Sequence, residues 1–348
     1  MKLLVKMARH RRMERTMMTR LLLIALLLTL GSSALSAQEL RFLNAFELRY
    51  PLTKLVVQRY ISNVEKATAG KVKFRQSGPE VVNAFQQFEP VSRGAFDLHF
   101  TVQPYHVGTT ALSLGIYTLD PDPEAFRKSG LFEVLDKEYQ RFNLKLLAIV
   151  PGSIKGIGSF HALLREPIGA SGDIQGRRVR GNPYFKPFID KAGGSMVVLQ
   201  HGETYPALQR RTIDGAFAPV IGSMEYRWHE VAKYSLRPTF GYFYQFLLIN
   251  TNSFARLSPS VQKIVVDEAA RVEVPGMQSL HEQMLEDDVG LQKQGMVLSR
   301  MAQAKFEAAL KGLMDGIWET VETSKATGAR APEFRAFLAR SGLATQVR

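Results

Sequence analysis

The chain contains no cysteine among its 348 residues. This absence excludes disulfide bonds, a thiolate nucleophile and any metal held by cysteine ligands. It also excludes the cysteine that a bacterial lipoprotein needs at its cleavage site. The fold must therefore be stabilised by apolar burial, and a chain of this length can bury a large core in two domains.

The sequence also lacks a hydrophobic run long enough to cross a membrane. Its apolar run extends only from Leu21 to Leu30, whereas spanning a bilayer takes about 20 residues. Basic residues precede this run and small residues follow it, which is the pattern of a secretory signal peptide. We therefore predict a signal peptide over residues 1–37, a periplasmic location, and no stable membrane insertion once the peptide is removed.

Strong charge of one sign is missing from the remainder of the chain. The formal net charge is +13, but seven basic residues and only one acidic residue lie within 1–37. What remains is moderately basic and has no basic block that would follow a nucleic-acid backbone. We expect no nucleic-acid partner, and at most weak steering of anions toward the protein.

Catalytic and metal-binding motifs are absent as well. His281-Glu282 has no second histidine four positions after the first, and 152–156 has the wrong spacing for a nucleophile elbow. Gly156-Ile157-Gly158 is too short for a dinucleotide fingerprint. The seven histidines do not cluster at metal-ligand spacings. We therefore predict no metal, no cofactor and no enzymatic activity.

What is present is an alternation of strands and helices. Strands are predicted over 40–46, 71–74, 96–102, 144–151, 155–160, 178–180, 195–199, 213–217, 244–250 and 295–298. Helices are predicted over 50–69, 81–92, 184–192, 204–210, 258–294, 302–323 and 332–338, the long one with a break near Pro275. This order favours an α/β fold with mainly parallel sheets.

The most specific pattern lies between residues 173 and 219. Its members are Asp173, Gly176, Val179 and Arg180, followed by Glu203, Tyr205, Ala207, Leu208, Gln209, Asp214, Gly215 and Pro219. This register resembles the solute-binding proteins of tripartite ATP-independent periplasmic (TRAP) transporters, of the dicarboxylate-binding type. Looser agreement extends the resemblance over the chain after the signal peptide, including the opening LRFLNAF and the helix start LSPSVQKIV.

The resemblance implies a two-domain periplasmic binding protein with a hinged cleft and a long helix that spans both domains. The implied boundaries are 38–157 with 244–283 for domain I, and 158–243 with 284–311 for domain II. Residues 312–348 would form C-terminal helices. The implied function is to capture an organic acid by domain closure and to deliver it to the membrane subunits of the transporter.

The resemblance also implies the ligand-binding residues. Arg180 takes the position of an arginine that pairs with the ligand carboxylate, a contact that a guanidinium makes with two parallel hydrogen bonds. His201 takes the place of an aromatic ring over the ligand. The other expected contacts are Asn44, Glu80, Gln103 and Tyr105 on loops that reach the cleft, Asn182 after Arg180, and Phe160 and Phe240 on the walls.

Departures from the family pattern bear on the ligand. The family's D-G-x-E-N-P reads Asp214-Gly215-Ala216-Phe217-Ala218-Pro219 here, so Ala218 takes the place of an asparagine that often binds the ligand. Phe160 lies near the position where some relatives have a second arginine. One cationic anchor with aromatic walls favours a carboxylate with an apolar or aromatic body over a sugar acid. Two alternatives remain open: a ligand-sensing subunit of a signalling system, and an enzyme that uses His201 with Glu203.

Overall fold

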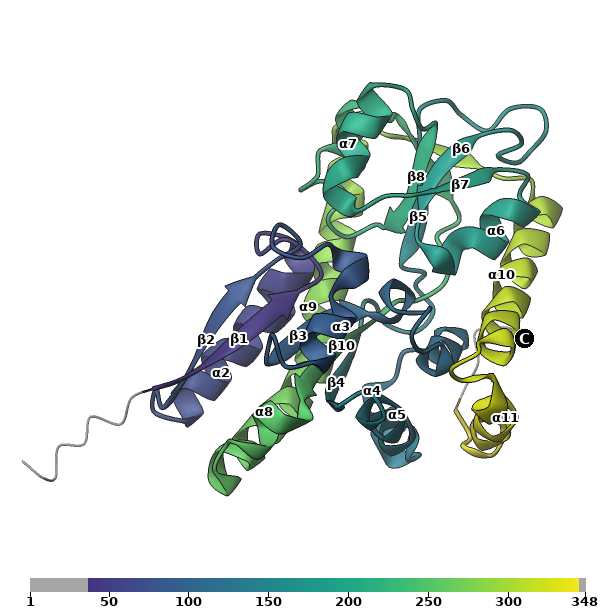
Figure 1. Ribbon diagram of the computed structural model, residues 1–348. Helices are drawn as coiled ribbons and strands as arrows, with labels where there is room; N and C mark the ends of the chain where they lie inside the picture. Colours follow the sequence, from purple (N-terminus) through teal and green to yellow (C-terminus); the bar gives the residue numbers. More distant parts are fainter. Residues whose placement is uncertain (1–36, 344–348) are drawn as a thin grey trace, which may run out of the picture. The chain divides into compact units, whose positions relative to one another are not determined.

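The computed structural model describes residues 37–343, so all but the last residue of the predicted signal peptide, together with residues 344–348, lie outside the described residues. The fold is a two-domain α/β fold built on two mixed sheets (Figure 1). Each domain, called a lobe below, carries one sheet. None of the helices between residues 37 and 343 has the length and apolar character needed to cross a membrane.

The first lobe contains a five-stranded sheet in the order β2-β1-β3-β10-β4. Its strands are β1 (Gln38–Asn44), β2 (Val72–Ser77), β3 (Leu98–Val102), β4 (Leu144–Pro151) and β10 (Tyr244–Asn250). Every residue of β3 and β10 is buried, as expected for central strands covered on both faces. The helices of this lobe are η1 (Thr53–Val57), α2 (Gln58–Ala67), η2 (Ala84–Gln86), α3 (Phe88–Ser92), η3 (Gln103–Tyr105), η4 (Leu112–Thr118), α4 (Pro123–Lys128), α5 (Leu131–Gln140) and α8 (Thr251–Ala255).

The second lobe contains a six-stranded sheet in the order β11-β9-β5-β8-β6-β7. Its strands are β5 (Phe160–Leu164), β6 (Arg178–Gly181), β7 (Ser195–Val198), β8 (Gly215–Pro219), β9 (Tyr234–Arg237) and β11 (Val297–Arg300). Its helices are η5 (Pro183–Phe185), α6 (Lys186–Lys191), α7 (His201–Gln209) and η6 (Trp228–Glu230).

Most strands within each sheet run in one direction, as the strand–helix alternation predicted, but each sheet is mixed because it contains a strand that runs against its neighbours. β10 runs antiparallel to β3 and β4, and β5 runs antiparallel to β8 and β9. The chain reaches each of these strands by crossing from the other sheet, β5 after β4 and β10 after β9. A third crossing leads from β10 to β11, which runs parallel to β9, so a crossing permits the antiparallel direction without imposing it. A crossing strand is free of the right-handed β-α-β connection that keeps neighbouring strands parallel.

The long helix α9 (Pro259–Lys293) contacts both lobes (Figure 1). Ser258 caps it and proline occupies its first turn, as the sequence predicts, and the helix continues through Pro275 without a break. Glu273 accepts hydrogen bonds from Arg127 and from the amide of Ile149 in the first lobe. Asp287, further along, accepts from the amide of Gly222 in the second lobe at 2.5 Å.

The C-terminal helices also connect the lobes. α10 (Gln303–Thr323) packs on α6 of the second lobe and on η4 of the first. After η7 (Gly328–Arg330) comes α11 (Ala331–Arg340). Arg330 pairs with the buried Glu138 of α5 at 2.8 Å, which fastens this end of the chain to the first lobe.

Candidate functional site

Arg180 lies on β6, between β7 and β8 of the second sheet. It is fully buried, with 0% of its surface exposed. Its Nε donates to the carbonyl of Leu199 and its Nη1 to the carbonyl of Phe217, both at 2.9 Å. Its Nη2 donates to Nδ1 of His201 at 3.3 Å. The guanidinium is therefore held in place by backbone that follows β7 and by backbone within β8.

No carboxylate pairs with Arg180 among residues 37–343, since none lies within 4.0 Å of its guanidinium. Its neighbour Arg178, in contrast, is exposed and pairs with Asp214 at 3.6 Å. Burying a cation without a counterion is unfavourable unless another group offsets it. Of the five N–H donors of a guanidinium, the three bonds above use three. The Tyr105 hydroxyl is a further contact of the guanidinium, so the arrangement leaves one donor and the positive charge available to an anion.

His201 is the first residue of α7, where Gln200 and Glu203 form a capping box. Because a guanidinium has no acceptor, Nδ1 of His201 must accept from Arg180, and its proton must lie on Nε2. The Tyr105 hydroxyl also contacts this Nδ1, at 3.2 Å. Burial and then the charge of Arg180 hold the His201 pKa well below its ordinary value. The imidazole is therefore neutral, and its Nε2 has no hydrogen-bond partner among the described residues.

Four aromatic rings surround His201, and they come from both lobes. The imidazole is stacked on Trp228 and Tyr226, with ring centroids 5.7 and 5.6 Å away. Phe46 and Tyr50 of the first lobe approach it at 5.5 and 5.7 Å. This packing fixes the imidazole beside Arg180.

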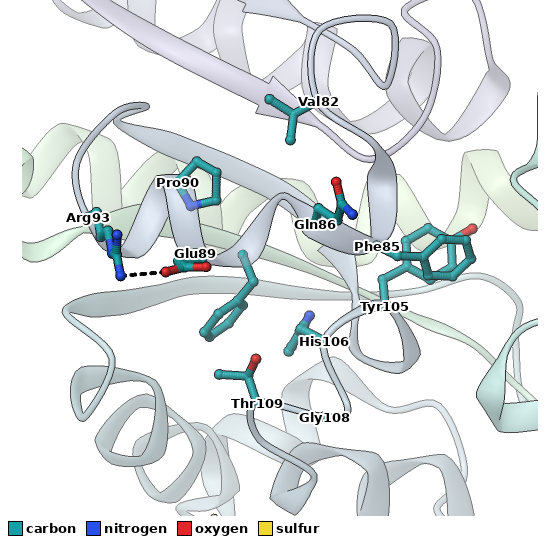
Figure 2. A pocket seen from close by; sticks show the side chains of 11 residues that line it. Val82, Phe85, Gln86, Glu89, Pro90, Arg93, Tyr105, His106, Gly108 and Thr109 are labelled. Carbon is teal, nitrogen blue, oxygen red and sulfur yellow. Dashed lines mark ion pairs between the residues drawn. The ribbon is translucent and has the colours of Figure 1, made fainter.

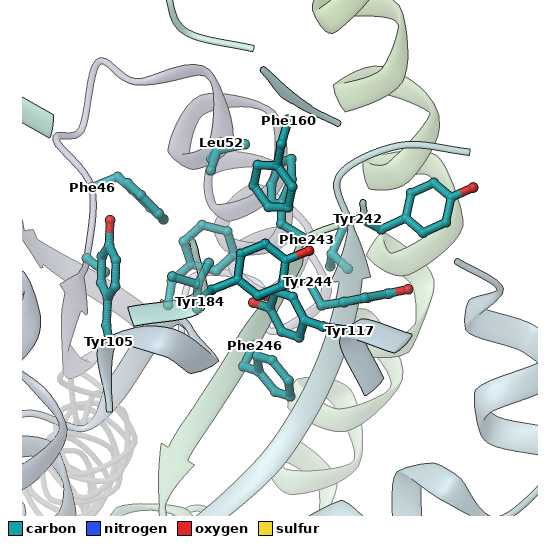
Figure 3. Close-up of a cluster of buried hydrophobic side chains, with 14 of the residues drawn as sticks. Phe46, Leu52, Tyr105, Tyr117, Phe160, Tyr184, Tyr242, Phe243, Tyr244 and Phe246 are labelled. Atoms are coloured by element: carbon teal, nitrogen blue, oxygen red, sulfur yellow. The ribbon is translucent and has the colours of Figure 1, made fainter. Parts of the chain in front are cut away.

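A narrow cavity lies next to this group. Its lining consists of Phe46, Leu52, Val102, Pro104, Tyr105, Tyr117, Phe160, Asn182, Tyr184, His201, Pro219 and Phe243, many of which are labelled in Figure 3. Its open space is about 20 Å³, close to the room that one water molecule needs. Both lobes contribute to its walls, so the lobes must separate, or the rings must move, before a larger molecule can enter.

The structure brings four of the predicted contact residues together around this cavity, namely Tyr105, Phe160, Asn182 and His201. Asn182 also caps η5, with its side chain accepting from the amide of Tyr184. Arg180 is not part of the lining. It lies behind the cavity wall and contacts His201. Burial raises the pKa of Tyr105 to about 12, although the positive charge of Arg180 acts to lower that pKa.

The other predicted residues lie away from the cavity lining. Asn44 is buried at the end of β1 and donates to the carbonyl of Ser77 at 3.1 Å. Gln103 is buried and donates to the carbonyl of Thr110 at 2.8 Å. Glu80 is exposed and accepts from the amide of Gly78. Phe240 belongs to the aromatic core of the second lobe, where it stacks on Phe188 at 4.6 Å.

Several residues of the cavity lining were not predicted from the sequence, namely Phe46, Leu52, Tyr117 and Tyr184. The rings of Tyr226 and Trp228, which stack on His201, were not predicted either. Phe46 is the last residue of the LRFLNAF segment, and Tyr184 lies four residues after Arg180. Their proximity in sequence to segments that resemble the family could have indicated that they belong to the site. Tyr226 and Trp228 reach His201 only through the packing of the loop after β8. No local sequence pattern indicates that these two residues lie at the site.

A second, wider hollow of about 660 Å³ lies on the first lobe (Figure 2). It is bounded by Phe85, Gln86, Tyr105, His106 and Thr109, among others. Its one arginine, Arg93, is exposed and pairs with Glu89 at 2.6 Å. The charge in this hollow is therefore already neutralised, unlike that of Arg180, although the Tyr105 ring borders both spaces.

Solved structures share this two-lobed architecture. An extracytoplasmic solute receptor of Bordetella pertussis that binds pyroglutamic acid superposes with a TM-score of 0.76 at 15% identity, covering 87% of this chain and 100% of that one. A TRAP periplasmic solute-binding protein of Desulfovibrio salexigens, solved with bound orotic acid, gives 0.73 at 20% identity, covering 87% and 99%. The fold is thus that of TRAP solute-binding proteins.

Sequence comparison identifies the family. Residues 61–321 match the family model of the bacterial extracellular solute-binding proteins, family 7, and the chain belongs to this family. A solute-binding protein of Roseobacter denitrificans is 27% identical over 149 residues, which is 42% of this chain and 46% of that protein. The match thus spans about half the length of that curated relative.

Proposed function

We propose that this protein is the extracytoplasmic receptor of a TRAP transporter, and that it captures a small organic acid through Arg180. The observation that carries the proposal is a fully buried guanidinium with no carboxylate partner among the described residues. The acid is enclosed between the lobes and is then presented to the membrane subunits. Its expected form is a carboxylate with an apolar or aromatic body.

The chemistry of Arg180 supports a carboxylate as its partner. A carboxylate accepts two parallel hydrogen bonds from a guanidinium, and such a pair is stronger in a cleft that excludes water. The carbonyls of Leu199 and Phe217 orient the guanidinium, so little ordering is needed when the ligand binds. The remaining contacts, to His201 and Tyr105, are the ones that an incoming carboxylate would share or replace.

Contacts between the lobes support closure over the ligand. The Tyr50 hydroxyl donates to the carbonyl of Ile221 at 2.8 Å. The amide of Ala84 donates to the side chain of Gln200, just before His201, at 3.1 Å. Separation of the lobes breaks these bonds and withdraws Tyr105 from His201 and Arg180. The site would then open to solvent, as capture of a ligand requires.

The enzyme alternative has little support from the geometry. It needs a carboxylate that orients His201, and Glu203 was the candidate. The Glu203 carboxylate instead accepts from the amide of Gln200 at 2.8 Å as part of the helix cap. The Nδ1 of His201 contacts Arg180 and Tyr105, so it has no acidic partner that would make it a general base.

The proposal is tested by replacing Arg180 with methionine. A thermal-shift panel of carboxylic acids that includes pyroglutamate and orotate selects the tightest ligand, and calorimetry then compares its affinity for three proteins. Arg180→Met should weaken binding by at least about 100-fold, equivalent to about 2.7 kcal/mol. Arg210→Met removes an exposed arginine from the same lobe and should leave the affinity unchanged. Equal affinities of the wild type and Arg180→Met would refute the role of Arg180.

A further inference from the structure

We propose that the site selects acids that carry one negative charge and discriminates against dicarboxylates of similar size. This inference rests on the proposed function, because it assumes that Arg180 binds the carboxylate. It concerns a different property, however: how many charges the closed site can neutralise. The structure provides one buried cation, Arg180, behind a cavity whose walls carry no lysine, arginine, aspartate or glutamate.

The first argument is the composition of the walls. None of the residues that line the cavity is a lysine, arginine, aspartate or glutamate. The lining is aromatic and aliphatic apart from Asn182, His201 and the tyrosine hydroxyls. A second carboxylate enclosed there would lose its water and would find no cation. Burial of an unpaired carboxylate is among the largest penalties in protein interiors.

The second argument is that His201 is unable to act as the missing cation. Its Nδ1 must accept from Arg180, so a proton on Nδ1 would place two donors face to face. Tyr226 and Trp228 stack against the ring and exclude water from it. Burial and the charge of Arg180 both lower its pKa. A protonated His201 would thus add a second buried positive charge beside the first.

The third argument is the pair of donors that remain in the walls. The Tyr184 hydroxyl and Nε2 of His201 are buried and have no hydrogen-bond partner among the described residues. Both can donate to an uncharged acceptor such as a carbonyl oxygen or a ring nitrogen. Leaving a buried donor unpaired costs about 1–3 kcal/mol. The acid that fits best is therefore a flat monocarboxylate with a neutral acceptor on its body.

Matched pairs of acids test the inference in the intact protein. Calorimetry at neutral pH compares benzoate with isophthalate, and pyroglutamate with glutarate. Tryptophan fluorescence provides a second readout, because Trp228 stacks on His201, and it is recorded in a Trp318→Phe background that removes the other tryptophan. The monocarboxylate of each pair should bind at least tenfold more tightly. Dicarboxylates that bind equally well or better would overturn the inference.

A charge-altering variant sharpens this test. His201→Lys places a second cation at the wall and should raise the affinity for isophthalate relative to benzoate by at least tenfold, whereas the neutral His201→Gln should keep the monocarboxylate preference. Should His201→Lys not fold, the wild-type ratios still decide the question.

The Arg180→Met variant separates the selectivity inference from the proposed function. If this variant abolishes binding of both members of each pair while their wild-type affinities are equal, the selectivity inference fails and the proposed function stands. If no acid binding depends on Arg180, the proposed function itself fails.

Discussion

Arg180 and Arg237 are two buried arginines of the same lobe, and their surroundings differ. Arg237 is 7% exposed and forms an ion pair with Asp288 of α9. It also donates to the Ser235 hydroxyl and to the carbonyl of Leu236. Arg180 is more deeply buried, and its partners are carbonyls, a neutral imidazole and the Tyr105 hydroxyl, none of which carries a negative charge. One charge is neutralised within the protein, and the other is not.

A buried histidine accompanies each arginine, and the contrast extends to it. His161 uses both ring nitrogens, with Ser235 at 2.9 Å and Ser223 at 3.0 Å. His201 uses only Nδ1. Structural polar groups in protein interiors are generally satisfied internally. An unpaired ring nitrogen also occurs at His99 and His106, but at His201 it adjoins a buried arginine that has no counterion among the described residues. The comparison therefore separates a structural arginine–histidine pair from one that is available to a ligand.

The largest expected effect comes from supplying Arg180 with an internal acid. His201→Asp places a carboxylate next to the guanidinium, so a ligand must compete with it. We expect acid binding to weaken by more than about 100-fold, or about 2.7 kcal/mol, while the melting temperature stays the same or rises because the buried charge is now paired. Calorimetry and thermal unfolding measure the two quantities.

The neutral variant His201→Asn isolates the charge in this experiment. It removes the imidazole without adding a carboxylate, so it should retain measurable binding. Equal losses of affinity in His201→Asp and His201→Asn would show that the shape of the imidazole matters, and not the charge beside Arg180. The distinction between the two arginines would then lose its basis.

The reverse experiment removes the acid from Arg237. Asp288→Asn leaves a buried guanidinium without its counterion. Breaking a buried pair costs about 3–5 kcal/mol, and the partial exposure of Asp288, 29% for its side chain, reduces the expected loss of unfolding free energy to about 1–3 kcal/mol. Ligand affinity should not change. Denaturant unfolding and calorimetry test both expectations, and a variant that loses affinity but not stability would contradict them.

Much of this fold was predictable from local sequence patterns. The strands at 144–151 and 244–250 have the predicted bounds, because each is largely apolar and almost entirely buried. The long helix begins at the predicted Ser258-Pro259 cap. The direction of the two antiparallel strands, β5 and β10, was not predictable in the same way, since both strands follow a crossing between the lobes. α4 and α5 were not predicted, although Asp122-Pro123 is an ordinary helix start.

The candidate site was predictable only in part. The register of 173–219 singled out Arg180 among the neighbouring arginines, and the structure makes it the buried one without an acid. The loop residues depend on tertiary packing, which explains why Glu80 lies exposed and Phe240 lies in the core. The rings around His201 come from both lobes, so no single segment of sequence contains that information.

The smallest predicted effect concerns acid pH and compares the two histidines. Burial and then a neighbouring arginine, Arg237 for His161 and Arg180 for His201, lower both pKa values well below the ordinary 6.5. The native state thus keeps both rings neutral, while the unfolded chain binds protons below about pH 6.5. Because the unfolded state then holds more protons, the unfolding free energy falls as the pH falls, by up to about 1.4 kcal/mol per pH unit for each histidine.

His161→Gln tests this dependence at the structural pair. A glutamine amide can still contact Ser223 and Ser235 but has no proton to gain, so the variant should lose stability less steeply, by about 1.2 kcal/mol between pH 6 and 5. Other buried histidines, such as His99 with a pKa of about 3, contribute equally to both proteins and cancel. Urea unfolding at several pH values measures the slopes. Equal pH slopes of the unfolding free energy in the wild type and the variant would mean that His161 gains its proton in the native state as well. The pair His161–Arg237 would then resemble the pair His201–Arg180 more closely than the hydrogen bonds of His161 imply.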